Sequence, residues 1–148
     1  MTTDLPEPPA FDPDLIFDHD DTIVATISAL IDPEEYMTPS LWFVLVHDTG
    51  HPLPVIVPID ELPDSPDPET SIRIFEALGD VLSEHAPGGT VVGTLVHPDG
   101  GVVSDHERRW YGHLHAAAHH AGVGIRALLT AGRRGTSIIR LDDVGMSA

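Results

Sequence analysis

The 148-residue chain contains neither cysteine nor lysine. Without cysteine it can form no disulfide framework and no thiolate metal site, so nothing in it favours secretion. Without lysine, the cation of a phosphate-binding loop and the amine of a Schiff base are both excluded, and the chain also lacks a Gly-x-Ser-x-Gly nucleophile motif. These absences exclude several common enzyme classes.

Long apolar segments are also missing. No run of about 18 apolar residues occurs, which is the length needed to cross a bilayer. The chain does not begin with basic residues followed by an apolar stretch, as a signal peptide would. We therefore expect a cytoplasmic protein.

Positive charge is scarce. The chain has 24 acidic and 7 basic residues, for a formal charge of −17, and all but one of the basic residues lie from Arg108 onward. Nucleic acids and anionic membranes are bound through Lys and Arg, so we expect neither as a partner. A solvated acidic surface explains this balance, and a basic partner is the alternative.

The length predicts one domain. Residues 1–18 hold four prolines among acidic residues and predict an extended or disordered arm, which could tuck Leu15, Ile16 and Phe17 onto the domain. We expect residues 19–142 to form a single α/β domain and residues 143–148 a frayed tail.

The residue pattern in the first half of this domain predicts a helix followed by two strands. Apolar spacing over residues 23–31 predicts a helix with Asp20 or Asp21 as its cap and Pro33 as its stop, while the many β-branched residues leave a strand as the alternative. Residues 41–46, LWFVLV, predict a buried strand, followed by a turn and a partner strand at 53–59. The prolines of this partner place it at a sheet edge.

The second half reads as helix, strand, helix, strand, strand. Asp67 and Pro68 begin a helix that ends near His85, and residues 90–96 predict a central strand. Ser104 and Glu107 form a Ser-x-x-Glu capping box at the start of a helix that Gly122 ends. Residues 125–130 and 136–141 predict a hairpin. The fold class is α/β, with a mixed central sheet flanked by helices.

Several stretches resemble the JAB/MPN fold, in particular its RadC-like branch: LWFVLVHDTGHPL, VVGTLVHPDGG, SDHE and AGVGIRALL, within residues 41–141. The resemblance implies a metal-binding His-x-His-Pro loop and a Ser-x-x-Asp, whose two His and one Asp hold zinc. Here His97 takes the second His position, Leu95 the first, and Glu107 the acidic position. The family's upstream catalytic Glu has only positional candidates, Glu34 and Glu61. The resemblance thus implies the fold with most metal ligands missing.

The candidate binding surface combines the loop after strand 90–96 with histidines that recur every seven residues along one flank of the following helix. It comprises His97, Asp99, Ser104, His106, His113 and His120. Each has a simpler explanation: Ser104 caps the helix, Asp99 belongs to a turn, and the histidines are partly buried or solvated. We assign no catalytic residue.

Two functions follow. The first is a non-catalytic domain without a cofactor that binds a protein or small ligand, as a monomer or a homodimer. The second is a zinc-dependent amide or isopeptide hydrolase, in which His97 and Glu107 are joined by a third ligand such as His47 or His51. A catalytic zinc site needs three protein ligands.

Overall fold

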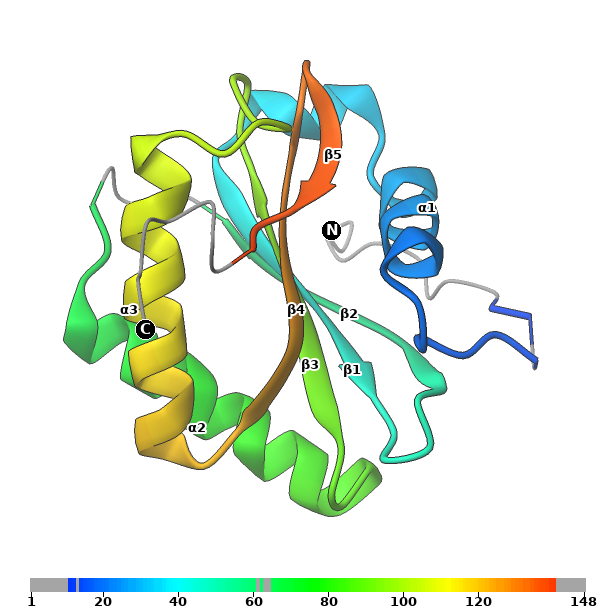
Figure 1. Cartoon of the computed structure of the whole chain (residues 1–148). Coiled ribbons are helices and arrows are strands. Elements are labelled where there is room, and N and C mark those ends of the chain that lie inside the picture. The colour runs from blue at the N-terminus through cyan, green and yellow to red at the C-terminus, as the bar shows by residue number, and fades with distance from the viewer. Residues whose placement is uncertain (1–10, 13, 61, 63–64, 141–148) are drawn as a thin grey trace, which may run out of the picture.

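The computed structural model describes residues 11–12, 14–60, 62 and 65–140. Most of the arm predicted at 1–18 and the whole tail predicted at 143–148 lie outside the described residues. The described chain is an α/β fold built on one mixed five-stranded sheet, with helices on both faces (Figure 1). The predicted α/β class with a mixed sheet flanked by helices is confirmed.

The elements follow the chain in the order α1 (Asp20–Leu30), η1 (Pro33–Met37), β1 (Ser40–Val46), β2 (Pro52–Asp60), α2 (Pro68–His85), β3 (Thr90–Val96), α3 (Asp105–Ala121), β4 (Gly124–Gly132) and β5 (Gly135–Ile138). The short 3-10 helix η1 was not expected. It begins at Pro33, the residue expected to stop the preceding helix, since proline is well tolerated at the first helical position.

The strand order in the sheet is β2-β1-β3-β4-β5. β3 and β4 are parallel, while β1 is antiparallel to both β2 and β3. Consequently β2, β3 and β4 point the same way, and the loops that follow them gather at one end of the sheet. This end carries the candidate site.

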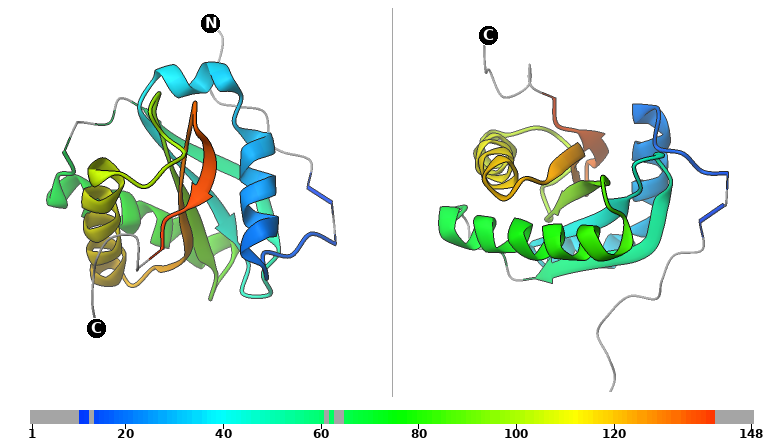
Figure 2. Two further views of the ribbon diagram at one scale, coloured as in Figure 1. Left: turned by 45° about the horizontal axis from the view of Figure 1, so that its top comes forward. Right: turned by 90° about the horizontal axis from the view of Figure 1, so that it is seen from below.

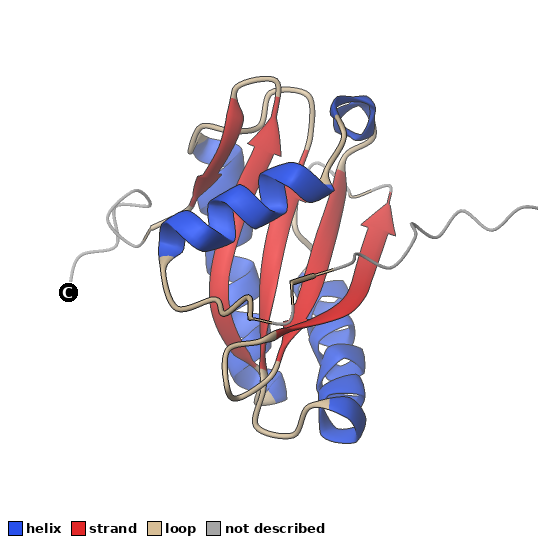
Figure 3. Cartoon of the chain, turned by 90° about the vertical axis from the view of Figure 1, so that its right-hand side faces the viewer, coloured by secondary structure: helices blue, strands red, loops and turns tan. Residues whose placement is uncertain are grey.

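Side chains on the two faces of β1 belong to two separate hydrophobic cores. Leu41, Phe43 and Leu45 face α2 and α3, while Trp42 and Val44 face α1. Because successive side chains of a strand point to opposite faces, a strand covered on both sides must be apolar throughout. Figure 2 shows α2 and α3 on one side of the sheet and α1 on the other, and Figure 3 shows α1 lying across the strands.

The prolines of β2 lie at a free edge, as predicted. Pro58 is paired with Trp42, and Val57 and Ile59 are paired with Phe43 and Leu41. Proline has no amide hydrogen, so the amides that bond β1 must come from Val57 and Ile59. The missing amides of the prolines therefore face away from the sheet.

Several element ends differ from the prediction. The helix preferred at the N-terminus is confirmed as α1, but its cap is His19, and both Asp20 and Asp21 lie within its first turn. β5 ends at Ile138 instead of continuing to 141, although the Ile139 amide still donates to the Leu128 carbonyl of β4 at 2.8 Å. The predicted end residue, Leu141, lies outside the described residues.

Phe17 is part of the core beneath α1. Its side chain is buried, its amide donates to the Gly50 carbonyl, and its own carbonyl accepts a bond from Arg126 Nε at 2.9 Å. In the part of the chain that the structure describes, no helix combines the length and apolar character needed to cross a bilayer.

A substitution at Gly93 tests how closely the central strand β3 is packed against its neighbours. A Cβ at this position would lie 2.8 Å from Leu128 Cδ2 and 3.0 Å from Phe43 Cε1. We expect Gly93→Ala to lower the free energy of unfolding by about 1–3 kcal/mol, measured by urea denaturation, because both neighbours must move.

The matched control is Gly112→Ala in α3, where an added Cβ meets nothing within 4 Å. This change should raise stability by up to about 1 kcal/mol, since alanine favours a helix over glycine. Equal effects from the two substitutions would contradict the packing described for Gly93.

Candidate functional site

A pocket of about 290 Å³ opens at the end of the sheet where β2 and β3 finish. Its lining comes from the entry to β1, the loop after β2, the end of β3 with its loop, and the start of α3: Pro39, Ser40, Leu62, Leu95, Val96, His97, Pro98, Asp99, Ser104 and His106. Ligands of open α/β sheets bind outside the carboxyl ends of strands. The pocket occupies that position.

Beside the pocket, the carboxylate of Glu107 is fully buried and receives four hydrogen bonds. Its Oε2 lies 2.5 Å from His97 Nε2 and accepts a bond from Thr130 Oγ1 at 2.8 Å. Its Oε1 accepts bonds from the amide of Ser104, at 3.0 Å, and from the Ser104 hydroxyl. The residue that closes the capping box of α3 thus also joins the helix to β4 and to the loop after β3.

This environment keeps Glu107 ionised. Burial by itself favours the neutral acid and would raise the pKa, but the hydrogen bonds from His97, Ser104 and Thr130 favour the anion. Together they lower the pKa of Glu107 from 4.5 to about 2. The buried group is therefore an anion at neutral pH, with hydrogen bonds that replace its lost hydration.

The Glu107 carboxylate also sets the orientation of His97. An ionised carboxylate only accepts hydrogen bonds, so Nε2 of His97 carries a proton and donates it. Within the described part of the chain, Nδ1 has no hydrogen-bond partner. His97 lines the pocket, so Nδ1 is the ring nitrogen left for a ligand.

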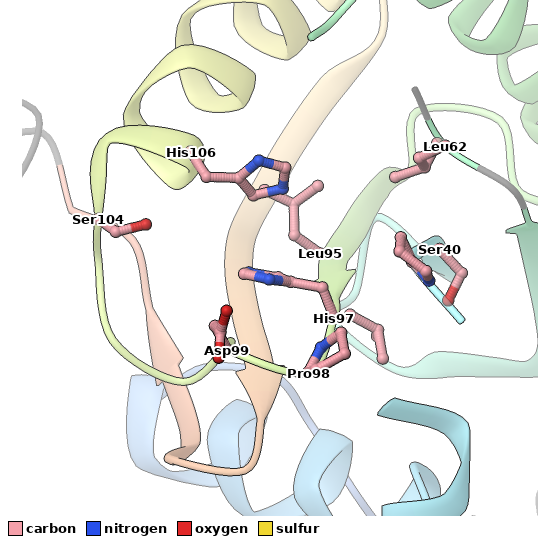
Figure 4. A pocket seen from close by; sticks show the side chains of 10 residues that line it. Ser40, Leu62, Leu95, His97, Pro98, Asp99, Ser104 and His106 are labelled. Carbon is pink, nitrogen blue, oxygen red and sulfur yellow. The ribbon is translucent and has the colours of Figure 1, made fainter. Parts of the chain in front are cut away.

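The structure brings together four of the six residues expected at the binding surface. His97, Asp99, Ser104 and His106 all line the pocket, and the ring centroids of the two histidines are 4.5 Å apart. Figure 4 shows these two rings side by side, with Leu62 and Ser40 on one side of them and Asp99 and Ser104 on the other.

The other two histidines of the expected surface lie elsewhere. His113 and His120 are exposed on α3, seven and fourteen residues after His106, which places them about 10 and 21 Å further along the helix. His120 lines a separate, polar depression between α2 and α3.

Sequence reasoning missed two contributors to the site, Leu62 and Thr130. Leu62 lies in a proline-rich loop, and Thr130 reads as an ordinary strand residue. In the structure Thr130 donates to Glu107 and accepts a bond from the Gly101 amide at 3.1 Å, which fixes the loop after β3. No local signal marks either residue, since Leu62 reaches the site through its amide bond to the Pro39 carbonyl and Thr130 through the pairing of β4 with β3.

The residues at the pocket do not form the zinc site that the resemblance implies. Leu95, in the first His position, is a buried apolar side chain, and Glu107 is bonded directly to His97. Among the described residues, no three His, Asp or Glu side chains are grouped so that they could hold a metal ion. His97 and Glu107 alone supply two donors, one fewer than a catalytic zinc site takes from the protein.

The proposed rescue by His47 or His51 is wrong. β1 is antiparallel to β3, so Ser40 pairs with Val96, while Val46 pairs with Thr90. His47 and His51 therefore lie at the opposite end of the sheet, roughly 20 Å from His97 at the rise of a strand. Of the two positional candidates for a catalytic Glu, Glu34 is exposed on η1 and Glu61 lies outside the described residues.

Comparison with known proteins gives no assignment: no protein-family model matches the chain, and no curated protein matches it at a significant level.

Glu107→Gln tests the buried carboxylate. The substitution keeps the shape but leaves His97, Ser104 and Thr130 without their anionic acceptor. We expect it to lower the free energy of unfolding at pH 7 by about 2–4 kcal/mol, measured by urea denaturation. The control Asp105→Asn, at an exposed position whose carboxylate bonds Arg108, should cost less than about 1 kcal/mol.

The same carboxylate predicts a pH dependence. The pKa of Glu107 is lower in the folded chain than in the unfolded chain, so its stabilisation is present above about pH 4.5 and is lost as the pH falls toward 2. A shift of this size corresponds to roughly 3 kcal/mol. The stability difference between the unsubstituted chain and Glu107→Gln should therefore shrink over this range. A difference that stayed constant from pH 6 to pH 2.5 would contradict the assignment.

Proposed function

We propose that this chain is a non-catalytic cytoplasmic domain of JAB/RadC-like fold that binds a small organic ligand in the pocket beside His97. Two features support the fold relationship: the sequence stretches that resemble the family, and the position of His97 and the Ser104–Glu107 pair at one end of a mixed sheet. The ligand-binding role is supported by the geometry of the pocket itself.

The proposal rests on how the two ring nitrogens of His97 are placed. Its Nε2 is held by the buried Glu107 carboxylate at 2.5 Å, and its Nδ1 is left for a ligand in the pocket. A side chain already fixed in this way loses little conformational entropy when a ligand binds. The imidazole is therefore a preorganised hydrogen-bonding group on an otherwise largely apolar lining.

The lining defines the chemistry of the ligand. Leu62, Leu95 and Pro98 offer apolar contacts, and Nδ1 of His97 offers one hydrogen-bonding nitrogen. A compact molecule with an apolar body and one hydroxyl group, which can donate or accept, satisfies both. Binding sites of this type combine apolar walls with a few placed polar groups.

The same geometry favours binding over catalysis. A general acid or base works best when its pKa lies near the operating pH. Glu107, with a pKa of about 2 and four hydrogen bonds, is too weak a base to take a proton at neutral pH. The carboxylate therefore acts as a positioning group for His97.

Blocking the pocket tests its role. In Leu62→Trp the larger ring occupies the pocket from its rim, so we expect loss of fragment binding with the fold retained. The measurement is a fragment screen by NMR, which follows the ring nitrogen signals of His97. Val102→Trp is the control, because Val102 is exposed in the loop after β3 and does not line the pocket.

The proposal would be wrong if no fragment at millimolar concentration shifted the His97 signals. It would also be wrong if the same fragments shifted them equally in Leu62→Trp.

Metal content separates this proposal from the hydrolase. We expect the untagged chain, purified without chelators or a nickel column, to contain zinc far below one equivalent by elemental analysis, with no change in His97→Ala. Zinc near one equivalent that disappeared in His97→Ala would favour the hydrolase instead.

A further inference from the structure

An apolar groove lies between the edge strand β2 and helix α2, away from the pocket of His97. It measures about 360 Å³. Val57 and Ile59 line it from β2, and Ile74, Ala77, Leu78 and Val81 line it from α2, with Thr70 and Arg73 at one end. All but two of the lining side chains are apolar.

The groove exists because the apolar face of α2 is wider than the sheet beneath it. Phe75, Leu78 and Leu82 are buried against the sheet, but Ile74 and Val81 are only half-buried and Ala77 is exposed. Ile74, Ala77, Leu78 and Val81 follow an i, i+3, i+4, i+7 spacing, which forms a continuous stripe along a helix. β2 is the last strand on this side, so within the described residues no further strand covers the stripe.

The edge of β2 is poorly suited to accept another strand. Pro52, Pro54 and Pro58 have no amide hydrogens on the outer side, where an added strand would need donors. An occupant must therefore pack by its side chains. A helix laid into the groove, with apolar residues at i, i+3, i+4 and i+7, fits this requirement.

The charges around the groove favour a cationic occupant. Asp60, which follows Ile59 on β2, and Glu69 and Glu84 on α2 are exposed, while the cation at the groove, Arg73, is bonded to Glu69 at 2.7 Å. A second copy of this chain would bring a further formal charge of −17. Charge complementarity thus favours a different, basic partner.

We propose that the groove docks an amphipathic helix of a partner protein, with its apolar side chains against α2 and β2 and its Lys and Arg side chains facing the acidic rim. This site does not depend on the pocket of His97. Recognition of a basic partner also explains why the first two-thirds of the chain contains so few basic residues.

The probes are two fluorescein-labelled synthetic peptides of identical Leu, Ala and Lys composition. One places its leucines at helical spacing on a single face, and the other has the same residues scrambled. Measured by fluorescence anisotropy, the patterned peptide should bind at least roughly tenfold more tightly than the scrambled one.

Ala77→Glu separates groove binding from charge attraction. It adds a negative charge, so a peptide held by charge alone would bind more tightly, whereas one seated in the groove should bind at least roughly tenfold more weakly. Ser83→Glu adds the same charge on the opposite flank of α2 and is the matched control. Val57→Thr, which keeps the side-chain shape, should weaken binding in the same direction as Ala77→Glu.

Three results would overturn the proposal: no measurable binding of the patterned peptide, equal binding of both peptides, or undiminished binding to Ala77→Glu. Sedimentation equilibrium tests whether a second copy of the chain occupies the groove instead. A dimer of the unsubstituted chain that Ala77→Glu dissociates would make a second copy the occupant and would also overturn the basic partner.

Discussion

The buried carboxylate of Glu107 is the constraint on which the candidate site depends. An anion inside the protein is strongly disfavoured unless hydrogen bonds replace its hydration. Here four donors from His97, Ser104 and Thr130 do so, and they come from the loop after β3, the start of α3 and the C-terminal part of β4. The Gly101 amide bonds Thr130, and its carbonyl accepts a bond from Ser137 on β5. One charge thereby fixes the loop that carries His97.

This arrangement differs from the metal centre of the family that the sequence resembles. The two positions that match metal ligands, His97 and Glu107, are bonded to each other, and the third holds Leu95 within the core. The negative charge receives its hydrogen bonds from protein donors. In the proposed function, the pocket offers an oriented imidazole beside apolar side chains for recognition of a ligand.

Local sequence patterns predicted most of the fold. The apolar run of β1, the prolines of the edge strand, the capping box of α3 and the glycine after α3 each act over a few residues, and the structure contains them as expected. Errors arose where tertiary contacts decide. The rescue by His47 failed because the pairing direction of β1 and β3 separates the strand ends that the sequence placed near each other.

The sequence by itself determined the α/β class, the extreme acidic charge and the candidacy of His97, Asp99, Ser104 and His106, because periodicity, composition and turn chemistry are local properties. Only the tertiary structure decided that Glu107 bonds His97, that Thr130 joins them, and that His113 and His120 stand apart. It also decided that, among the described residues, nothing covers part of the apolar face of α2, since this depends on where the sheet ends. Contacts between residues far apart in the chain follow from strand order and direction, which no local pattern encodes.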